Sequence, residues 1–269
     1  MTARVIYDMP EHEYHAHPAF SQSGAKVLLK SPARFKWERD NPVHRDVFDE
    51  GSAAHRLVLG VGADIYVVPA ESWRTNDSKM QQAEARRNGL VPVLPETYER
   101  VAAMADKLSE HSLAMQLLSA GDPEVSLFHT DPATGVKIRG RFDFLGAVIA
   151  SDYKTTAKED PQAFGRSVAD FGYHMQAAWY LDLLEAVGLP RQAFAFIVQS
   201  KTPPYDVFVS DLTDAAIQRG RELNRRAIER FRDCTASGLW PSPVRDDAWI
   251  TTDLPRWAYY DNEIEEQTA

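Results

Sequence analysis

Three short apolar runs in the middle of the chain constrain its fold most. They span residues 124–129, 136–145 and 147–153, and turn residues such as Thr134-Gly135 separate them. Alternate side chains of a strand share a face, so Asp152 and Lys154 should point the same way. If the second and third runs pair as neighbouring strands, Asp143 joins these two side chains on one patch of the sheet.

Two carboxylates and an ammonium group on one patch need a partner or a role, because half-buried charges are unfavourable alone. The alternative is a surface hairpin with ordinary charges. However, the apolar run Val148-Ile149-Ala150 directly precedes Asp152, which indicates a strand that enters a core. A divalent metal would neutralise the carboxylates, since Mg²⁺ binds through one or two carboxylates together with phosphate oxygens of a substrate. The pattern therefore outlines a site for phosphodiester cleavage.

Periodicity elsewhere in the chain predicts helices and further strands. Helices are expected at 21–40 (with a second start at Pro32 after a Ser31 cap), 46–59, 76–88, 95–119 (with a break near Ser112), 171–187 and 213–237, and strands at 65–68, 193–199 and 205–210. This order predicts an α/β fold, with a central mixed sheet flanked by helices and an N-terminal helical portion. We expect one domain over residues 1–269, with N-terminal helices in 1–60, a catalytic core in 120–240 and a tail in 255–269.

The composition limits the classes of protein to which the chain can belong. Cys234 is the only cysteine, which excludes an internal disulfide and a cysteine-cluster metal site. No apolar run approaches 18 residues and residues 1–14 lack an apolar core, so we expect no transmembrane helix, no signal peptide and a reducing, intracellular location. The net charge of −9 argues against nucleic-acid binding over the whole surface, but it leaves room for a focused basic groove.

Two further segments carry side chains that suit a functional site. Gln176 and Tyr180 lie four residues apart on a predicted helix and share a face, although an ordinary helix with aromatic core residues is the alternative. His55 follows the small residues Gly51-Ser52-Ala53-Ala54, which allow close packing. A lone helical histidine is more often a core residue than a ligand, and the segment by itself leaves both interpretations open.

Taken together, these segments resemble the RecB-like branch of the PD-(D/E)xK nucleases, and above all the phage exonucleases of the RecE (exonuclease VIII) type. The matching segments, in family order, are Ser21-Gln22-Ser23, Ser31-Pro32-Ala33, Gly51 to His55, Glu124, Gly140 to Asp143, Asp152 to Thr156, Gln176-x-x-x-Tyr180 and Leu254 to Ala258. Phe142 replaces the proline of the family name, at a position where many relatives vary. One cysteine excludes the iron–sulfur branch, which needs four.

The resemblance implies a restriction-endonuclease-like core and a metal centre. Asp143 and Asp152 would bind Mg²⁺ or Mn²⁺, with the Tyr153 carbonyl, His55 and Glu124 as further ligands. For Glu124, a plain strand-edge glutamate is the alternative. The resemblance gives three side chains catalytic roles: Lys154 orients the attacking water or stabilises the developing charge, Gln176 holds the geometry, and Tyr180 packs beneath the site or touches DNA. Whether Lys154 is charged there stays open at this stage.

The resemblance also suggests where DNA phosphates bind. Ser21 and Ser23 open a helix whose backbone amides could hold a phosphate, close to the 5′-phosphate pocket of the resembling exonucleases, but simple N-capping is the alternative. Thr155, Thr156 and Arg74 are further candidates. Glutamates among the arginines of the helix at 213–237 reduce its positive charge, so we expect a solvent-exposed face there rather than a DNA-binding one.

The implied function is a metal-dependent exodeoxyribonuclease that resects duplex DNA ends from 5′ to 3′ and leaves 3′ overhangs for phage-type recombination or DNA repair. The resemblance implies a homo-oligomeric ring, a single-strand annealing protein as partner, no membrane association, and the cytoplasm of a bacterial host. An endonuclease or single-strand-preferring nuclease of the same superfamily is one alternative. A DNA-end-binding scaffold with a vestigial site is another, although the intact Asp143, Asp152, Lys154 and Gln176 set argues against it.

Overall fold

The structure is a computed structural model that describes residues 3–41, 46–157, 160–244, 249–255 and 259. Of the expected tail at 255–269, all residues except Pro255 and Tyr259 lie outside the described part of the chain. Within the described residues, no helix combines the length and the apolar character needed to span a bilayer.

A seven-stranded mixed sheet forms the centre of the molecule, as predicted. Its strands are β1 (Arg4–Ile6), β2 (Phe20–Ser21), β5 (Gly121–Thr130), β6 (Lys137–Gly146), β7 (Ile149–Thr156), β8 (Ala193–Ser200) and β9 (Val207–Ser210). The order is β1-β5-β6-β7-β8-β9, with β2 parallel to β6. Strands β5, β6 and β7 form the expected antiparallel meander, and β8 joins β7 in parallel after a helical crossover.

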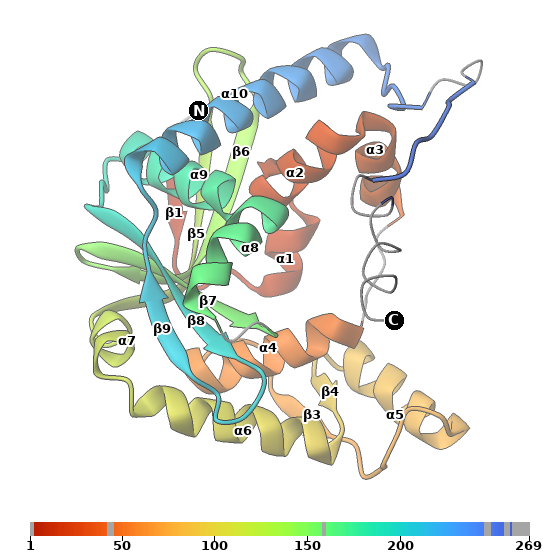
Figure 1. The fold of residues 1–269 in the computed structure, drawn as a ribbon, viewed down its shortest axis with the longest axis vertical. Coiled ribbons are helices and arrows are strands. Elements are labelled where there is room, and N and C mark those ends of the chain that lie inside the picture. The colour runs from red at the N-terminus through yellow and green to blue at the C-terminus, as the bar shows by residue number, and fades with distance from the viewer. Residues whose placement is uncertain (1–2, 42–45, 158–159, 245–248, 256–258, 260–269) are drawn as a thin grey trace, which may run out of the picture.

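Helices cover both faces of this sheet (Figure 1). On one side lie α2 (Gln22–Lys30), α3 (Pro32–Asp40), α8 (Phe164–Phe171), α9 (Tyr173–Ala186) and α10 (Asp214–Ser237). On the other side lie α4 (Asp46–Leu59), α6 (Pro95–Ser109) and α7 (Ser112–Leu117), next to α5 (Asn76–Arg87) and the two-stranded sheet of β3 (Ile65–Val67) and β4 (Val91–Val93). The main core packs Trp179 of α9 against the sheet residues Phe142 and Phe196, whereas Tyr153 and Ile197 belong to a second core beneath α4 and α6.

Local sequence signals explain where several helices begin. Ser21 Oγ accepts a 3.2 Å hydrogen bond from the Gly24 N–H at the start of α2, and Ser31 Oγ accepts one of 3.1 Å from the Arg34 N–H at the start of α3. Side-chain acceptors of this kind satisfy backbone donors that have no partner within the first helical turn. The long expected helix over 21–40 is therefore divided at Ser31, as the sequence predicted.

Other elements differ from the expectation. The helix expected at 171–187 begins at Phe164 and breaks at Gly172, whose φ of +67° is left-handed and ends α8. The strands β1, β2 and β4, the helix α1 (Glu11–Ala16) and a 3₁₀ turn at Pro161–Ala163 were not predicted. Each is too short to show a period in the sequence, so tertiary contacts rather than local pattern decide them.

Candidate active site

The site forms where strands β6 and β7 separate. The two strands pair at Phe144 with Ser151 and at Leu145 with Ala150, and no pairing continues beyond these residues. At the opening, Asp143 Oδ2 accepts a 2.9 Å hydrogen bond from the backbone N–H of Tyr153. The Asp143 side chain of β6 thus accepts a hydrogen bond that a backbone carbonyl would accept in a regular ladder. This brings the Asp143 carboxylate beside Asp152.

Asp152 is held by two neighbouring side chains. Its Oδ1 accepts a 2.6 Å hydrogen bond from Gln176 Nε2 of α9, and its Oδ2 lies 2.5 Å from Lys154 Nζ. Only 2% of the Asp152 side chain is exposed. Burial alone would lower the pKa of Lys154, but Asp152 and Asp143 outweigh it and hold that pKa above its usual value. Lys154 is therefore charged at neutral pH.

Asp143 experiences the opposite effect. Burial, and then the charge of Asp152, raise the pKa of the Asp143 carboxyl to about 6, although His55 and Lys154 oppose the rise. The neighbour of the buried Asp152 Oδ2 is the Lys154 ammonium group, 2.5 Å away. Two crowded carboxylates fit a divalent cation, which binds through carboxylate oxygens.

Helix α4 brings His55 to the same place. Its Nδ1 lies 3.6 Å from Asp143 Oδ2, and its ring packs edge-on against Tyr153 with centroids 5.5 Å apart. The fully buried Ala53 and Ala54 let the helix approach the sheet this closely. Among the described residues, however, no three His, Cys, Asp or Glu side chains converge as a ready-made metal site. The donor set present suits Mg²⁺ completed by water and substrate oxygens more than an all-protein cage.

Tyr153 and Tyr180 lie on opposite faces of the sheet. Tyr153 is buried in the second core, where its hydroxyl donates a 2.6 Å hydrogen bond to Gln199 Oε1. Tyr180 is buried in the main core, with its ring 4.5 Å from that of Phe142. Tyr180 therefore packs beneath the site, which is one of the two roles considered for it, while the ligand role of the Tyr153 carbonyl stays a prediction.

Glu124 lies across from Asp143 on β5. Its neighbours Pro123 and Val125 pair with Phe144 and Phe142, the residues on either side of Asp143. Glu124 has a φ of +50°, and its Oε2 lies 3.7 Å from Arg141 Nη1. The structure thus gives Glu124 a cationic neighbour, and a metal-ligand role for it also stays a prediction.

The residues proposed to contact DNA are spread over several elements. Ser21 caps α2 and its hydroxyl lies 3.0 Å from that of Ser23. Thr155 and Thr156 end β7, in register with Gln199 and Ser200 of β8. Arg74 lies between β3 and α5, outside the group around Asp143. These residues therefore come from different elements, and their contacts with DNA stay a prediction.

Lys26 of α2 is a residue that the sequence reasoning missed. Its Nζ donates a 2.9 Å hydrogen bond to the Phe171 carbonyl, and its aliphatic chain passes over Gly172, where a Cβ would lie 2.8 Å from Lys26 Cδ. Burial, and then the charge of Lys154, lower the pKa of Lys26 to about 8. No local signal identifies it, because only the packing of α2 against the α8–α9 junction places it near Lys154.

Comparisons with known proteins agree with this geometry. The profile of a family described as "PDDEXK-like domain of unknown function" (DUF3799) matches residues 21–245. A candidate exonuclease from Eubacterium rectale has a similar structure, with a TM-score of 0.65 over 95% of this chain and 99% of that one. The two sequences are 13% identical, so the likeness shows a shared fold.

A second solved structure gives a weaker match. It is an alkaline exonuclease from Laribacter hongkongensis, with 14% identity over 69% of this chain and 93% of that one. Its TM-score of 0.25 is too low to carry an argument. No curated protein matches the sequence.

Proposed function

This chain belongs to the PDDEXK-like family DUF3799, and on that premise we propose that it is a metal-dependent deoxyribonuclease that degrades duplex DNA from 5′ ends and leaves 3′ overhangs. One observation carries the proposal: Asp143, Asp152 and Lys154 meet where β6 and β7 separate. Nucleases of the PD-(D/E)xK type generally use divalent metals such as Mg²⁺ or Mn²⁺. The 5′-to-3′ direction and the duplex preference derive from the resemblance to RecE-type exonucleases.

Each side chain has a role that its contacts support. Asp143 and Asp152 would hold the metal, which when bound polarises the scissile phosphate and lowers the pKa of a water molecule. Against the effect of burial, Asp152 and Asp143 hold the pKa of Lys154 above its usual value in the metal-free protein, so its ammonium group can donate hydrogen bonds to that water or to a phosphate oxygen. Gln176 and the Tyr153 N–H fix the orientations of Asp152 and Asp143.

Further features of the proposal rest on the resemblance. His55, Glu124 and the Tyr153 carbonyl would complete the metal shell, and Ser21, Ser23, Arg74, Thr155 and Thr156 would contact DNA. Residues 1–269 would act as one nuclease domain. The protein would form a ring around DNA and would work beside a single-strand annealing protein in a bacterial cytoplasm.

Digestion of end-labelled DNA tests the proposal. The purified protein is incubated with Mg²⁺ or Mn²⁺ and with linear duplexes labelled at the 5′ or the 3′ end, and closed circular DNA is the parallel substrate. We expect early release of the 5′ label from linear DNA and no cleavage of circles, with Asp152→Ala inactive. Cleavage of circles would favour an endonuclease. Binding of DNA ends without cleavage in either metal would favour a scaffold.

A further inference from the structure

A row of basic side chains on β6 leads to the active site. Lys137, Arg139 and Arg141 alternate along the strand and therefore share one face of the sheet, and Asp143 is the next residue in the row. Successive members are about 7 Å apart, because a strand rises about 3.4 Å per residue. Neither arginine is among the residues expected at the site.

Both arginines are buried without adequate anionic partners. The exposed fraction is 9% for Arg139 and 11% for the side chain of Arg141. Among the described residues, Arg139 has no carboxylate within ion-pair distance, and Arg141 has only Glu124, with an N···O distance of 3.7 Å that is too long for a hydrogen bond. Buried guanidinium groups are normally paired, because an uncompensated buried charge is strongly unfavourable.

The two guanidinium groups also keep donors that nothing accepts. Arg139 donates from Nη2 to the His15 carbonyl at 3.3 Å, and Arg141 donates to the Met9 carbonyl and, at 2.9 Å, to Ser126 Oγ. Arg139 Nε, Arg139 Nη1 and Arg141 Nη1 make no hydrogen bond although they are buried. Leaving such donors unsatisfied costs the full penalty of removing them from water. The pair therefore has the donors, and lacks the acceptor, of an anion-binding site.

Tyr14 of α1 covers both arginines. The guanidinium carbons of Arg139 and Arg141 lie 4.5 and 4.6 Å from the centroid of the Tyr14 ring, in cation–π contact. Helix α1 has no side-chain cap, and Tyr14 is its buried residue. Tyr14 packs with Ala19 and Phe128 in a small cluster separate from the two larger cores. Ile6 and Met9 add partly buried apolar surface to this cluster, so α1 is held by a small apolar cluster and by its contacts with the two arginines.

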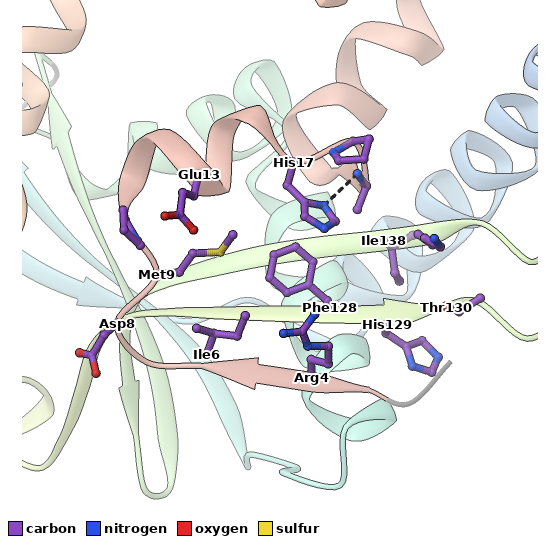
Figure 2. Close-up of a pocket in the computed structure, with 14 residues that line it drawn as sticks. Arg4, Ile6, Asp8, Met9, Glu13, His17, Phe128, His129, Thr130 and Ile138 are labelled. Atoms are coloured by element: carbon purple, nitrogen blue, oxygen red, sulfur yellow. Dashed lines mark hydrogen bonds between the residues drawn. The ribbon is translucent and has the colours of Figure 1, made fainter. Parts of the chain in front are cut away.

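A cavity adjoins α1 on the side away from the arginines' contact with Tyr14. Figure 2 shows α1 running beside β6, with Met9 and His17 between the helix and that strand and with Phe128 on β5. A cavity of about 550 Å³ lies beside α1, and Lys137 lines it together with Asp8 and Glu13, whereas Arg139, Arg141 and Tyr14 do not. A loosely packed helix above two charged, unsatisfied side chains can be displaced by a ligand that pairs with those charges.

We propose that Arg139 and Arg141 form a binding site for phosphate groups of the DNA backbone next to the active site, and that Tyr14 covers it until DNA displaces α1. The planar guanidinium group matches phosphate with two parallel hydrogen bonds. The row ends at Asp143, so a strand with a phosphate at the metal can place its neighbouring phosphates on the arginines. This inference rests on the proposed function, because only a nuclease role supplies DNA as the ligand. Free phosphate would satisfy the same donors, so the test must distinguish the two.

DNA binding without cleavage tests the site. Anisotropy of a labelled duplex is measured over a range of salt concentrations, with Ca²⁺ held constant in place of Mg²⁺. We expect Arg139→Gln to weaken binding about tenfold and to reduce the slope of log K against log salt by about one, and Arg139→Lys to restore that slope. Tyr14→Ala should act in the opposite direction and tighten binding, because it uncovers the arginines. Arg219→Gln, at an exposed arginine of α10 paired with Glu222, is the matched control and should change neither quantity.

The outcomes separate this inference from the proposed function. If wild type binds DNA but Arg139→Gln and Tyr14→Ala leave affinity and slope unchanged, the arginines only anchor α1 and the inference fails, while the nuclease proposal stands. If wild type does not bind DNA, thermal denaturation with inorganic phosphate tests whether the two arginines bind an anion at all. Stabilisation of wild type but not of Arg139→Gln would assign the site to free phosphate and count against the DNA function. No stabilisation would overturn the inference.

Discussion

Gln176 Nε2 lies 2.6 Å from Asp152 Oδ1, so a helix that begins 21 residues after Asp152 fixes the orientation of that carboxylate. The Gln176 side chain is buried, and it occupies one of the two Asp152 oxygens. The other oxygen faces Lys154, and under the proposed function it also faces the metal. The hydrogen bond therefore decides which way the Asp152 carboxylate faces.

Removing this hydrogen bond should impair cleavage more than folding. Because partners that orient a metal ligand typically contribute about 10- to 100-fold to metal affinity or activity, we expect Gln176→Ala to lower kcat/KM for DNA by that factor. Steady-state digestion of a labelled duplex at several Mg²⁺ concentrations measures the loss. Gln192→Ala, at an exposed glutamine before β8, is the control and should behave as wild type. Equal losses in both variants would contradict the role of Gln176.

The raised pKa of Asp143 predicts a pH-dependent stability. The folded protein binds a proton on Asp143 more tightly than the unfolded chain, so this residue lowers stability as the pH rises from about 4 to about 6. Asp143→Asn should therefore raise the free energy of unfolding of the metal-free protein at pH 7, by at most about 3 kcal/mol, and should change little at pH 4.

Urea denaturation in the presence of a chelator measures this effect at both pH values. Asp182→Asn is the control, because Asp182 is half-exposed and paired with Arg221 on the surface. An equal gain for Asp143→Asn at pH 4 and pH 7 would show that the carboxylate charge is not its cause.

A bound divalent cation should stabilise the fold. Binding to the native state alone adds about 2.7 kcal/mol when the cation concentration is 100 times its Kd. We expect Mg²⁺ to raise the Tm of wild type and of Asp182→Asn, and to have little effect on Asp152→Asn, which lacks one carboxylate of the site. Thermal denaturation with and without Mg²⁺ measures the shift. If Mg²⁺ raised the Tm of Asp152→Asn as much as that of wild type, the metal would bind at another site.

His55 provides a test of the third ligand. Imidazole nitrogen suits Mn²⁺ better than Mg²⁺, which prefers oxygen. If His55 binds the metal, His55→Ala should reduce the Mn²⁺-induced rise in Tm more than the Mg²⁺-induced rise. His111→Ala provides the control, since His111 caps α7 on another part of the molecule. Identical responses of His55→Ala to both metals would argue for a structural contact with Asp143 only.

Gly140 tests the packing beneath the site. A Cβ there would lie 2.6 Å from the Tyr180 ring and 2.9 Å from Leu183 Cδ1. Overpacking of this kind typically costs about 1–3 kcal/mol, so Gly140→Ala should lower the free energy of unfolding by that amount. In Gly165→Ala, the new Cβ has open space on α8, and the variant should be neutral or more stable by up to about 1 kcal/mol. Chemical denaturation of both variants measures the contrast.

The sequence predicted the fold class because its signals are local. Alternation along 136–145 and 147–153 places Asp143 and Asp152 on paired strands, with Lys154 directly after the second, and the structure has these strands as β6 and β7. The start of α3 after Ser31 follows from capping, which needs only three residues. The sequence did not predict the break at Gly172, because the residues on both sides of it favour a helix. The left-handed conformation of this glycine is visible only in the folded chain.

The sequence by itself therefore determined which side chains share a strand or helix face, since the periods of 2 and 3.6 residues are properties of the local backbone. The tertiary structure alone decided which faces meet. It brought His55 of α4 to Asp143 and Lys26 of α2 close to Lys154, and it buried Arg139 and Arg141 beneath Tyr14. The physical reason is that packing between distant segments depends on how whole apolar faces fit together, which no short window of residues contains.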